Sequence, residues 1–301
     1  MNHAERMKYI GGSDIAAVMG LSRWSSPLQL WAEKTGKIPP KDLSALEHVE
    51  IGTDLEEYVA QKFTKKTGYK IRRDQRTFTH ADYPYMVGHI DRWVCGEDAI
   101  LECKTTSGWN AREWEGEDMP KEYILQVMWY LGLVGKTVGY VACLIGGQKF
   151  AWKEIKFDDA LFKNMVEAAR SFWEDFVLTG LPPVASAFDG DTLEALFPGS
   201  NESTIHFEAE NNAVLNDLIE QRQGGVEQMN LVKEEVERLS NLIKQHLGEA
   251  TYGQTDQYKI SWKSQSRTTP DSDQLKRDGL FEMYSKTSTF KVLRTSKLKG
   301  A

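Results

Sequence analysis

Two apolar runs on either side of a short cluster of turn formers constrain this chain more than any other feature. The runs cover residues 85–94 and 99–105, and the cluster between them is Cys95-Gly-Glu-Asp98. This pattern predicts a β-hairpin. A turn centred on the middle of the cluster places Asp91 directly opposite Glu102, with their Cβ atoms roughly 4.5–5.5 Å apart on one face of the sheet.

Two carboxylates at that separation repel each other unless a cation lies between them. Lys104 follows Glu102 by two residues and therefore lies on the same face of its strand. Together with Asp91, these residues predict a site for a hard cation with an ammonium group beside it.

The neighbours of Glu102 help to decide between this site and an ordinary surface. The simpler interpretation makes Asp91 a strand-end acid, and Glu102 with Lys104 an exposed pair that neutralises itself. Apolar residues nevertheless occupy both faces of the strand, namely Ile100 on the side of Glu102, and Leu101 and Cys103 on the other. A strand covered on both faces favours the cation site.

A helix is predicted over residues 46–67, because apolar residues recur at helical spacing and Gly68 can end it. Its core-facing residues are Leu55, Val59, Ala60 and Phe63. Glu56 shares this face, where a carboxylate is costly without a partner, so we expect it to be a third acid of the hairpin site. The adjacent Glu57 is expected to point into solvent.

Composition narrows the class of protein. Hydrophobic residues make up 41% and charged residues 27% of the 301 residues, as in an ordinary soluble globular protein. The three cysteines fit a reducing compartment and cannot supply the four thiolates that an iron–sulfur cluster usually takes. No signal core and no membrane-spanning apolar run is present, which predicts a cytoplasmic protein. The net charge of −7 does not exclude a DNA enzyme, because a local basic groove can coexist with an acidic body.

Near the N-terminus, a glycine turn precedes two residues that favour helix starts. Gly11-Gly12 is followed by Ser13 and Asp14, and a short helix is expected over residues 15–19. Either side chain could simply cap this helix, or the bare amides of the turn could bind an anion.

The segment after Lys104 carries further candidates. A polar loop contains Trp109 and Trp114, which could stack on unpaired bases or pack beneath the loop. An amphipathic helix follows over residues 121–134, and it presents Gln126 and Tyr130 on one face.

The order of these elements predicts an α/β fold, with a mixed central sheet flanked by helices, over residues 1–198. The remaining helices and strands of this part are expected at residues 28–35, 71–78, 138–145, 149–157 and 161–178.

Residues 199–301 have a different character and are expected to form a C-terminal extension. A long charged helix is predicted over residues 211–247, and Gly224-Gly225 should break or kink it, giving a helical hairpin or a short assembly helix. Alternating Tyr-x-Ile-x-Trp predicts a strand after Tyr252. Residues 256–301 hold ten Lys/Arg against five Asp/Glu, a basic tail that could touch phosphates or keep the end in solution.

Taken together, these motifs resemble the YqaJ-type viral recombinase family, the phage λ exonuclease-like branch of the PD-(D/E)XK nuclease superfamily. The resemblance covers residues 6–157, and the superfamily's Pro-Asp is Ile90-Asp91 here. The motifs that carry it are Ile10-Gly11-Gly12-Ser13-Asp14, Trp31 with Lys34-Thr35-Gly36, Gly52-Thr-Asp-Leu-Glu56, Gly88-His-Ile-Asp91, Leu101-Glu102-Cys-Lys104 and Gln126-Val-x-x-Tyr130.

The resemblance implies a role for each residue of the hairpin site. Asp91 and Glu102 would hold a divalent metal together with the Cys103 carbonyl, and Lys104 would orient or deprotonate the attacking water. Glu56 would complete the acidic shell or serve a second metal.

It also implies contacts with the substrate on either side of the metal. Gln126 and Tyr130 would position the water and the phosphate. Arg6 and Ser13 would bind the 5′-phosphate of the degraded strand, although Lys8 could replace Arg6.

The activity implied is that of a metal-dependent 5′→3′ exonuclease that leaves 3′ single-stranded tails on linear double-stranded DNA. Oxygen ligands favour Mg²⁺ or Mn²⁺ over zinc, and the absence of a Gly-rich nucleotide loop predicts no need for ATP. Kinship implies a ring-shaped trimer, a single-strand annealing partner and, for a phage gene, the bacterial host cytoplasm. The alternatives are an endonuclease of the same superfamily, or a non-catalytic DNA-binding or assembly protein.

Overall fold

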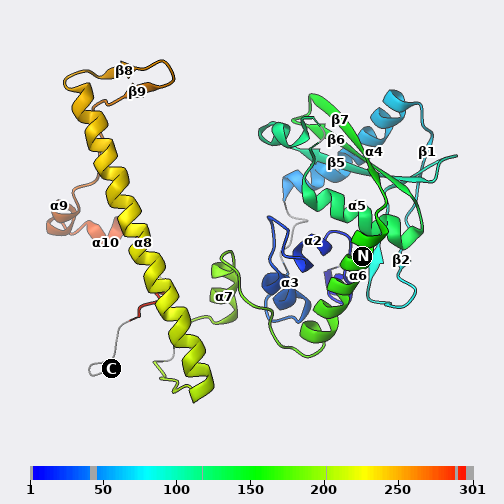
Figure 1. Ribbon diagram of the computed structural model, residues 1–301, viewed down its shortest axis with the longest axis horizontal. Coiled ribbons are helices and arrows are strands. Elements are labelled where there is room, and N and C mark those ends of the chain that lie inside the picture. Colours follow the sequence, from blue (N-terminus) through cyan, green and yellow to red (C-terminus); the bar gives the residue numbers. More distant parts are fainter. Residues whose placement is uncertain (1–2, 41–45, 117, 201, 289–290, 296–301) are drawn as a thin grey trace. The chain divides into compact units, whose positions relative to one another are not determined.

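The computed structural model describes residues 3–40, 46–116, 118–200, 202–288 and 291–295. By its internal contacts the chain divides into two units, Met1–Pro198 and Gly199–Ala301 (Figure 1). The first unit contains a five-stranded sheet between helices, and the second contains a long helix and a small hairpin. Among the described residues, no helix is long and apolar enough to cross a membrane.

The sheet of the first unit has the strand order β1-β4-β5-β6-β7. Its strands are β1 (Ile71–Arg73), β4 (Arg92–Val94), β5 (Ala99–Thr106), β6 (Val138–Ile145) and β7 (Lys149–Lys156). All neighbouring strands are antiparallel except β5 and β6, which run parallel. A parallel pair needs a crossover connection, and this one contains the short 3₁₀-helix η1 (Gly108–Trp114) and α5 (Lys121–Val134).

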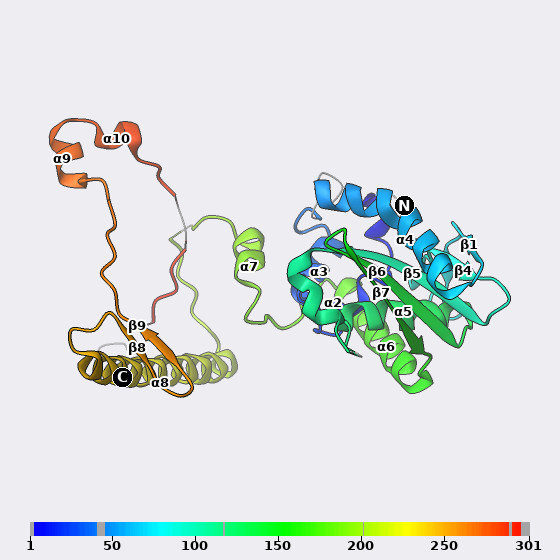
Figure 2. The same ribbon diagram turned by 90° about the horizontal axis from the view of Figure 1, so that it is seen from above.

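Helices cover both faces of this sheet (Figure 2). The helices are α1 (His3–Arg6), α2 (Ile15–Val18), α3 (Pro27–Lys34), α4 (Glu47–Thr67), α5, α6 (Asp159–Ser171), its π-helical continuation η2 (Phe172–Val177) and α7 (Gly190–Leu196). The α4 helix packs on one face, where Phe63 is buried with Leu101 of β5. On the other face α5 packs against the sheet and shares one core with α2, α3 and α6. Because strand side chains alternate, β5 presents Leu101 to α4 and Glu102 to α5.

Most element boundaries follow the sequence prediction, because the end signals act locally. The Ser26 hydroxyl accepts the Gln29 N–H (2.9 Å) and caps α3. The α4 helix ends at Gly68, which has a left-handed φ of 82°. The predicted helix over residues 121–134 and the predicted strand over residues 138–145 are confirmed as α5 and β6.

The hairpin of β4 and β5 forms in the predicted register. Arg92 pairs with Leu101 and Val94 with Ala99, around a turn in which Gly96 has a φ of 84°. The register prediction is therefore confirmed for the paired residues.

The predicted continuous strand over residues 85–94 is wrong in its first half. The short strand β3 (Val87–Gly88) pairs with β2 (Phe78–Thr79) in a separate two-stranded sheet, and Asp91 lies in the bend before β4. The predicted strand over residues 71–78 is interrupted too, and only its ends form β1 and β2. Between them Asp74 accepts the Trp93 indole N–H (2.6 Å) and the Arg76 backbone N–H (2.9 Å), which turns the chain away from the sheet.

In the second unit, α8 (Ala209–Leu247) is a single helix that continues through Gly224 and Gly225. The predicted break is therefore wrong: a glycine costs about 1 kcal/mol relative to alanine in a helix, and the flanking helix formers outweigh it. The hairpin β8 (Tyr252–Gln254) and β9 (Lys259–Ser261) confirms strand structure after residue 251. Two short helices follow, α9 (Ser272–Arg277) and α10 (Phe281–Tyr284).

Candidate active site

The end of β5 carries a polar cluster on the face covered by α5. Lys104 Nζ donates a hydrogen bond to Oε1 of the buried Glu102 (2.7 Å). The Gln126 amide of α5 donates to the same oxygen (2.9 Å) and to the Tyr130 hydroxyl one turn further along (2.9 Å). The structure thus brings together four residues that the sequence predicted for one site.

Asp91 joins this cluster from the bend before β4. Its Oδ2 accepts the backbone N–H of Cys103 (2.8 Å), so the carboxylate lies beside the strand segment between Glu102 and Lys104. The N–H and C=O groups of a strand residue point to the same side, and the Cys103 carbonyl therefore faces Asp91 as well. The two acids meet as the hairpin register predicted, although Asp91 lies just outside β4.

Burial and charge act against each other in this cluster. Burial raises the pKa of Asp91 well above its ordinary value, and the charge of Glu102 raises it further. Burial lowers the pKa of Lys104, but the carboxylates of Glu102 and Asp91 outweigh this effect and leave that pKa raised. Lys104 is therefore an ammonium group, and the residual repulsion between the acids favours additional positive charge.

One oxygen of the cluster lacks a partner. Glu102 Oε2 is buried and accepts no hydrogen bond within the described part of the chain. A buried carboxylate oxygen without a donor is costly, and a cation would satisfy it. The oxygens available as metal ligands are those of Asp91, of Glu102 and of the Cys103 carbonyl, and this set fits Mg²⁺ or Mn²⁺. No group of three His, Cys, Asp or Glu side chains that could hold a metal occurs among the described residues.

The predicted third acid, Glu56, lies on the α4 side of the hairpin. Its Oε1 pairs with Nη1 of the buried Arg92 (2.6 Å), and Arg92 Nη1 also donates to the backbone carbonyl of Asp91 (2.8 Å). Arg92 therefore links Glu56 to the backbone of Asp91, and the metal-binding role of Glu56 stays a prediction. The prediction that Glu57 points into solvent is confirmed, since its side chain is 60% exposed, and its carboxylate also pairs with Arg92 Nη2 (2.9 Å).

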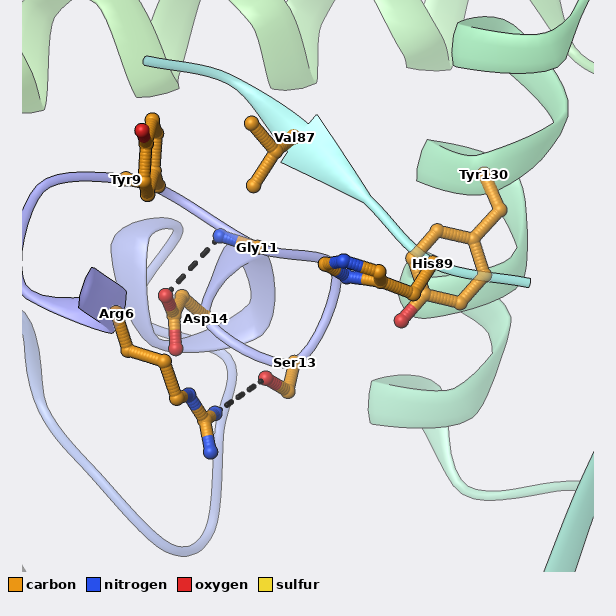
Figure 3. A pocket seen from close by; sticks show the side chains of 9 residues that line it. Arg6, Tyr9, Gly11, Ser13, Asp14, Val87, His89 and Tyr130 are labelled. Carbon is orange, nitrogen blue, oxygen red and sulfur yellow. Dashed lines mark hydrogen bonds between the residues drawn. The ribbon is translucent and has the colours of Figure 1, made fainter. Parts of the chain in front are cut away.

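A pocket lies between the N-terminal loop and α5 (Figure 3). Its lining is Arg6, Tyr9, Gly11, Gly12, Ser13, Asp14, Val87, His89 and Tyr130. Arg6 Nη2 donates to Ser13 Oγ (3.3 Å), so the predicted phosphate-binding pair meets in this pocket. Lys8, the alternative cation, is absent from the lining, although it belongs to the described part of the chain.

A buried lysine fixes the shape of this loop. Lys34 Nζ donates to the carbonyls of Arg6 (2.8 Å) and Tyr9 (2.6 Å) and to Asp14 Oδ2 (2.7 Å), and the Lys34 side chain is only 5% exposed. Asp14 occupies the N-cap position of α2, but its side chain accepts the Gly11 N–H (3.1 Å) instead of capping the helix. The predicted side-chain cap is therefore wrong. Since Lys34 neutralises Asp14, Arg6 determines the positive sign of the pocket.

Tyr130 connects the pocket to the acids. Gly12 and Gly88 lie against its ring, and a Cβ atom would come within 2.3 Å of the ring at Gly12 and 2.9 Å at Gly88. Sequence reasoning missed His89, which lines the pocket and whose Nε2 lies 2.9 Å from Thr77 Oγ1. Burial and the Arg6 charge lower the pKa of His89. Its place two residues before Asp91 is the signal that could have drawn attention to it.

The two tryptophans of the loop after β5 behave differently. Trp114 is buried, and its ring centroid lies 5.9 Å from that of Tyr123 on α5. Trp109 is 95% exposed. Packing therefore accounts for Trp114, while the base-stacking alternative for Trp109 stays a prediction.

Comparisons with known proteins identify the family of the chain. The family model of the YqaJ-like viral recombinase domain matches residues 3–137, a range that contains every residue of the cluster and the pocket. The uncharacterized protein YqaJ of Bacillus subtilis (strain 168) is 38% identical over 291 residues, which cover 94% of this chain and 88% of that protein. The chain belongs to the YqaJ-like viral recombinase family.

The fold of the chain is shared with a solved structure. The crystal structure of an alkaline exonuclease from Laribacter hongkongensis aligns with a TM-score of 0.51 at 18% identity, covering 60% of this chain and 92% of that one. The predicted fold class, a mixed central sheet flanked by helices with a mostly helical C-terminal part, is confirmed.

Proposed function

We propose that this YqaJ-like chain is a divalent-metal-dependent exonuclease that degrades one strand of linear double-stranded DNA in the 5′→3′ direction. The observation that carries the proposal is the meeting of Asp91, Glu102 and Lys104 on one face, with one buried carboxylate oxygen left unsatisfied. Family membership and the fold shared with an exonuclease support the same reaction class.

Each side chain of the cluster has a task in phosphodiester hydrolysis. Asp91 and Glu102, with the Cys103 carbonyl, would hold Mg²⁺ or Mn²⁺. Such an ion supplies a Lewis acid and lowers the pKa of water. Lys104 donates hydrogen bonds and orients the attacking water, and its positive charge offsets the charge that develops on the phosphate. Gln126 donates a hydrogen bond to Glu102 Oε1, which leaves Oε2 as the oxygen available to the cation.

The N-terminal pocket supports the proposed polarity. Arg6 and Ser13 offer a charged and a neutral donor to a terminal phosphate, as suits anion recognition. Tyr130 lines this pocket and also accepts from Gln126, so a phosphate bound there is a near neighbour of the acids. An enzyme that holds a 5′-phosphate beside its scissile position starts at 5′ ends and leaves 3′ tails.

Two further properties are proposed from kinship with the YqaJ-like family. We infer a ring-shaped trimer acting on DNA ends, and a single-strand annealing protein that receives the 3′ tails. We also expect no requirement for ATP, because the sequence has no Gly-rich nucleotide-binding loop. The C-terminal unit has no assigned task in this scheme.

The test is incubation with Mg²⁺ and linear duplexes that carry a 5′-phosphate on one strand and a 5′-hydroxyl on the other. We expect the phosphorylated strand to shorten from its 5′ end, and Arg6→Ala with Ser13→Ala to remove this strand preference. Cutting of covalently closed circles would instead support the endonuclease alternative. Tight DNA binding without any hydrolysis in Mg²⁺ or Mn²⁺ would support the non-catalytic one.

A further inference from the structure

An aromatic pair forms the wall of the site at the N-terminal end of α5. Tyr123 lies one turn before Gln126, and Lys104 Nζ lies 5.1 Å from the centroid of its ring. Trp24, from the loop between α2 and α3, packs on Tyr123 with ring centroids 6.0 Å apart. Trp24 is 55% exposed. An accessible indole ring therefore packs on the same tyrosine that contacts the Lys104 ammonium group.

The loop that carries Trp24 is held in place by a buried glutamate. Both the backbone N–H and Nε of Arg23 donate to Glu122 Oε1 (3.1 and 3.0 Å), and Arg23 Nη1 pairs with Glu113 (2.5 Å). The Arg23 guanidinium also lies over the Trp24 ring, 5.5 Å from its centroid. The indole is therefore oriented before any ligand arrives, and little conformational entropy is lost on binding.

The charges around this pair disfavour a phosphate as its ligand. The adjoining hollow is lined by three acids, Glu113, Asp118 and Glu122, and by two basic residues, Arg23 and Lys121. The Arg23 charge is already taken by two of these acids. The accessible part of this surface is the flat ring of Trp24, and a nucleobase of any identity can stack on such a ring.

We propose that Trp24 and Tyr123 form a stacking platform for one nucleobase of the strand that is cut, a proposal that rests on the proposed exonuclease function. Along α5, Tyr130 with the phosphate pocket lies on one side of Gln126 and Tyr123 lies on the other. The base on the platform therefore belongs to the nucleotide on the 3′ side of the hydrolysed phosphodiester. Trp24 holds this base and is a binding residue rather than a catalytic one.

The experiment combines protein variants with abasic DNA. The full-length chain acts in Mg²⁺ on 5′-phosphorylated duplexes that carry one abasic nucleotide at the first, second, third or fourth position. For the wild type, we expect an abasic nucleotide immediately 3′ of the first cut to slow the first cleavage about 10-fold, the size of one lost base stack. Trp24→Ala should slow cleavage of the intact duplex by the same factor and show no further loss on the abasic one. Trp24→Phe should restore most of both effects.

Trp109→Ala is the comparison variant, because Trp109 is also an exposed indole and is the other candidate for base stacking. We expect this variant to keep the full abasic effect. An unchanged abasic effect in Trp24→Ala, or its loss in Trp109→Ala, would overturn the proposal.

A second readout separates this proposal from the proposed function. The affinity of the wild type and Trp24→Ala for the same duplexes is measured in EDTA, where no hydrolysis is needed. We expect the wild type to bind the abasic duplex more weakly than the intact one and Trp24→Ala to bind both equally. Equal binding by the wild type overturns the platform, whereas a lack of hydrolysis in Mg²⁺ contradicts only the exonuclease.

Discussion

Two groups of charged side chains meet at the β4–β5 hairpin, each with two acids and one base. On the side of α5 the group is Asp91, Glu102 and Lys104, whereas on the side of α4 the hairpin residue Arg92 meets Glu56 and Glu57 of α4 itself. On the α4 face the buried Arg92 pairs with both acids. On the α5 face Lys104 pairs with one acid, and a buried oxygen of Glu102 stays without a donor.

The difference shows how a site can be told from a structural ion-pair network. Both clusters contain a partly or fully buried base, so charge content does not separate them. The pKa of Asp91 is raised by burial and by Glu102, whereas hydrogen bonds from Gln61 and Arg92 lower the pKa of Glu57. The repulsion between Asp91 and Glu102 is not fully relieved by other side chains, and it therefore indicates that the α5 face is the one that binds a ligand.

The largest expected effect is on activity. Lys104→Ala should reduce degradation of linear duplexes at least about 100-fold, because it removes the group that orients water and offsets phosphate charge. DNA affinity, measured by fluorescence anisotropy, should stay largely intact. The matched substitution on the other face is Glu57→Ala, which should degrade DNA at close to the wild-type rate. Wild-type degradation by Lys104→Ala would remove the assignment of the active site.

The next effect is on stability and comes from the α4 face. Arg92→Met should lower the free energy of unfolding by about 2–3 kcal/mol, less than the roughly 3–5 kcal/mol of a fully buried broken pair, because Glu56 and Glu57 can hydrate. It should also slow hydrolysis, since Arg92 holds the Asp91 carbonyl. Urea unfolding and initial rates measure the two effects. A variant that is as stable as the wild type would mean that the α4 cluster is not a structural network.

Asp91→Asn should act in the opposite direction on stability. The folded chain retains the Asp91 proton while the unfolded chain loses it near its ordinary pKa of about 3.9, so this group makes stability fall as pH rises from about 4 to the folded pKa. Replacing this carboxyl should stabilise the metal-free protein at pH 7, because the raised pKa of Asp91 makes its ionisation in the folded chain unfavourable. Unfolding curves in EDTA between pH 4 and 8 provide the measurement. Destabilisation at every pH would contradict the repulsion between the acids.

The smallest effect belongs to Glu57→Gln, with no more than about 0.5 kcal/mol at pH 7, because the side chain is largely exposed. The lowered pKa of Glu57 gives a contribution that is complete above the ordinary value of about 4.3 and is lost as pH falls. The variant should therefore differ from the wild type least at low pH, as Asp91→Asn does, but at pH 7 the two variants should change stability in opposite directions. A Glu57→Gln variant that is more stable than the wild type at pH 7 would reverse the sign assigned to this pair.

Local signals made much of the site predictable. The turn residues around Gly96 determined the register of β4 and β5, and strand alternation then placed Lys104 beside Glu102. Helical spacing placed Gln126 and Tyr130 on one face of α5. In each case the relevant residues lie within a few positions of one another or across a tight turn.

What the sequence did not reveal depends on contacts between distant segments. The strand break before Asp91 follows from the pairing of β3 with β2 and from the close approach of Gly88 to Tyr130. The packing of Trp24 on Tyr123 joins a loop and a helix that no local pattern connects. The position of Arg92 was within reach, because alternation turns it away from Asp91 and toward α4.

Lys34 has a consequence for how the phosphate pocket forms. A single nitrogen atom gathers two carbonyl oxygens and a carboxylate from different points along the N-terminal loop. Loss of that ammonium group, by acylation or by Lys34→Met, weakens all three contacts together. We therefore expect the loop that presents Arg6 and Ser13 to lose its shape as one unit rather than residue by residue.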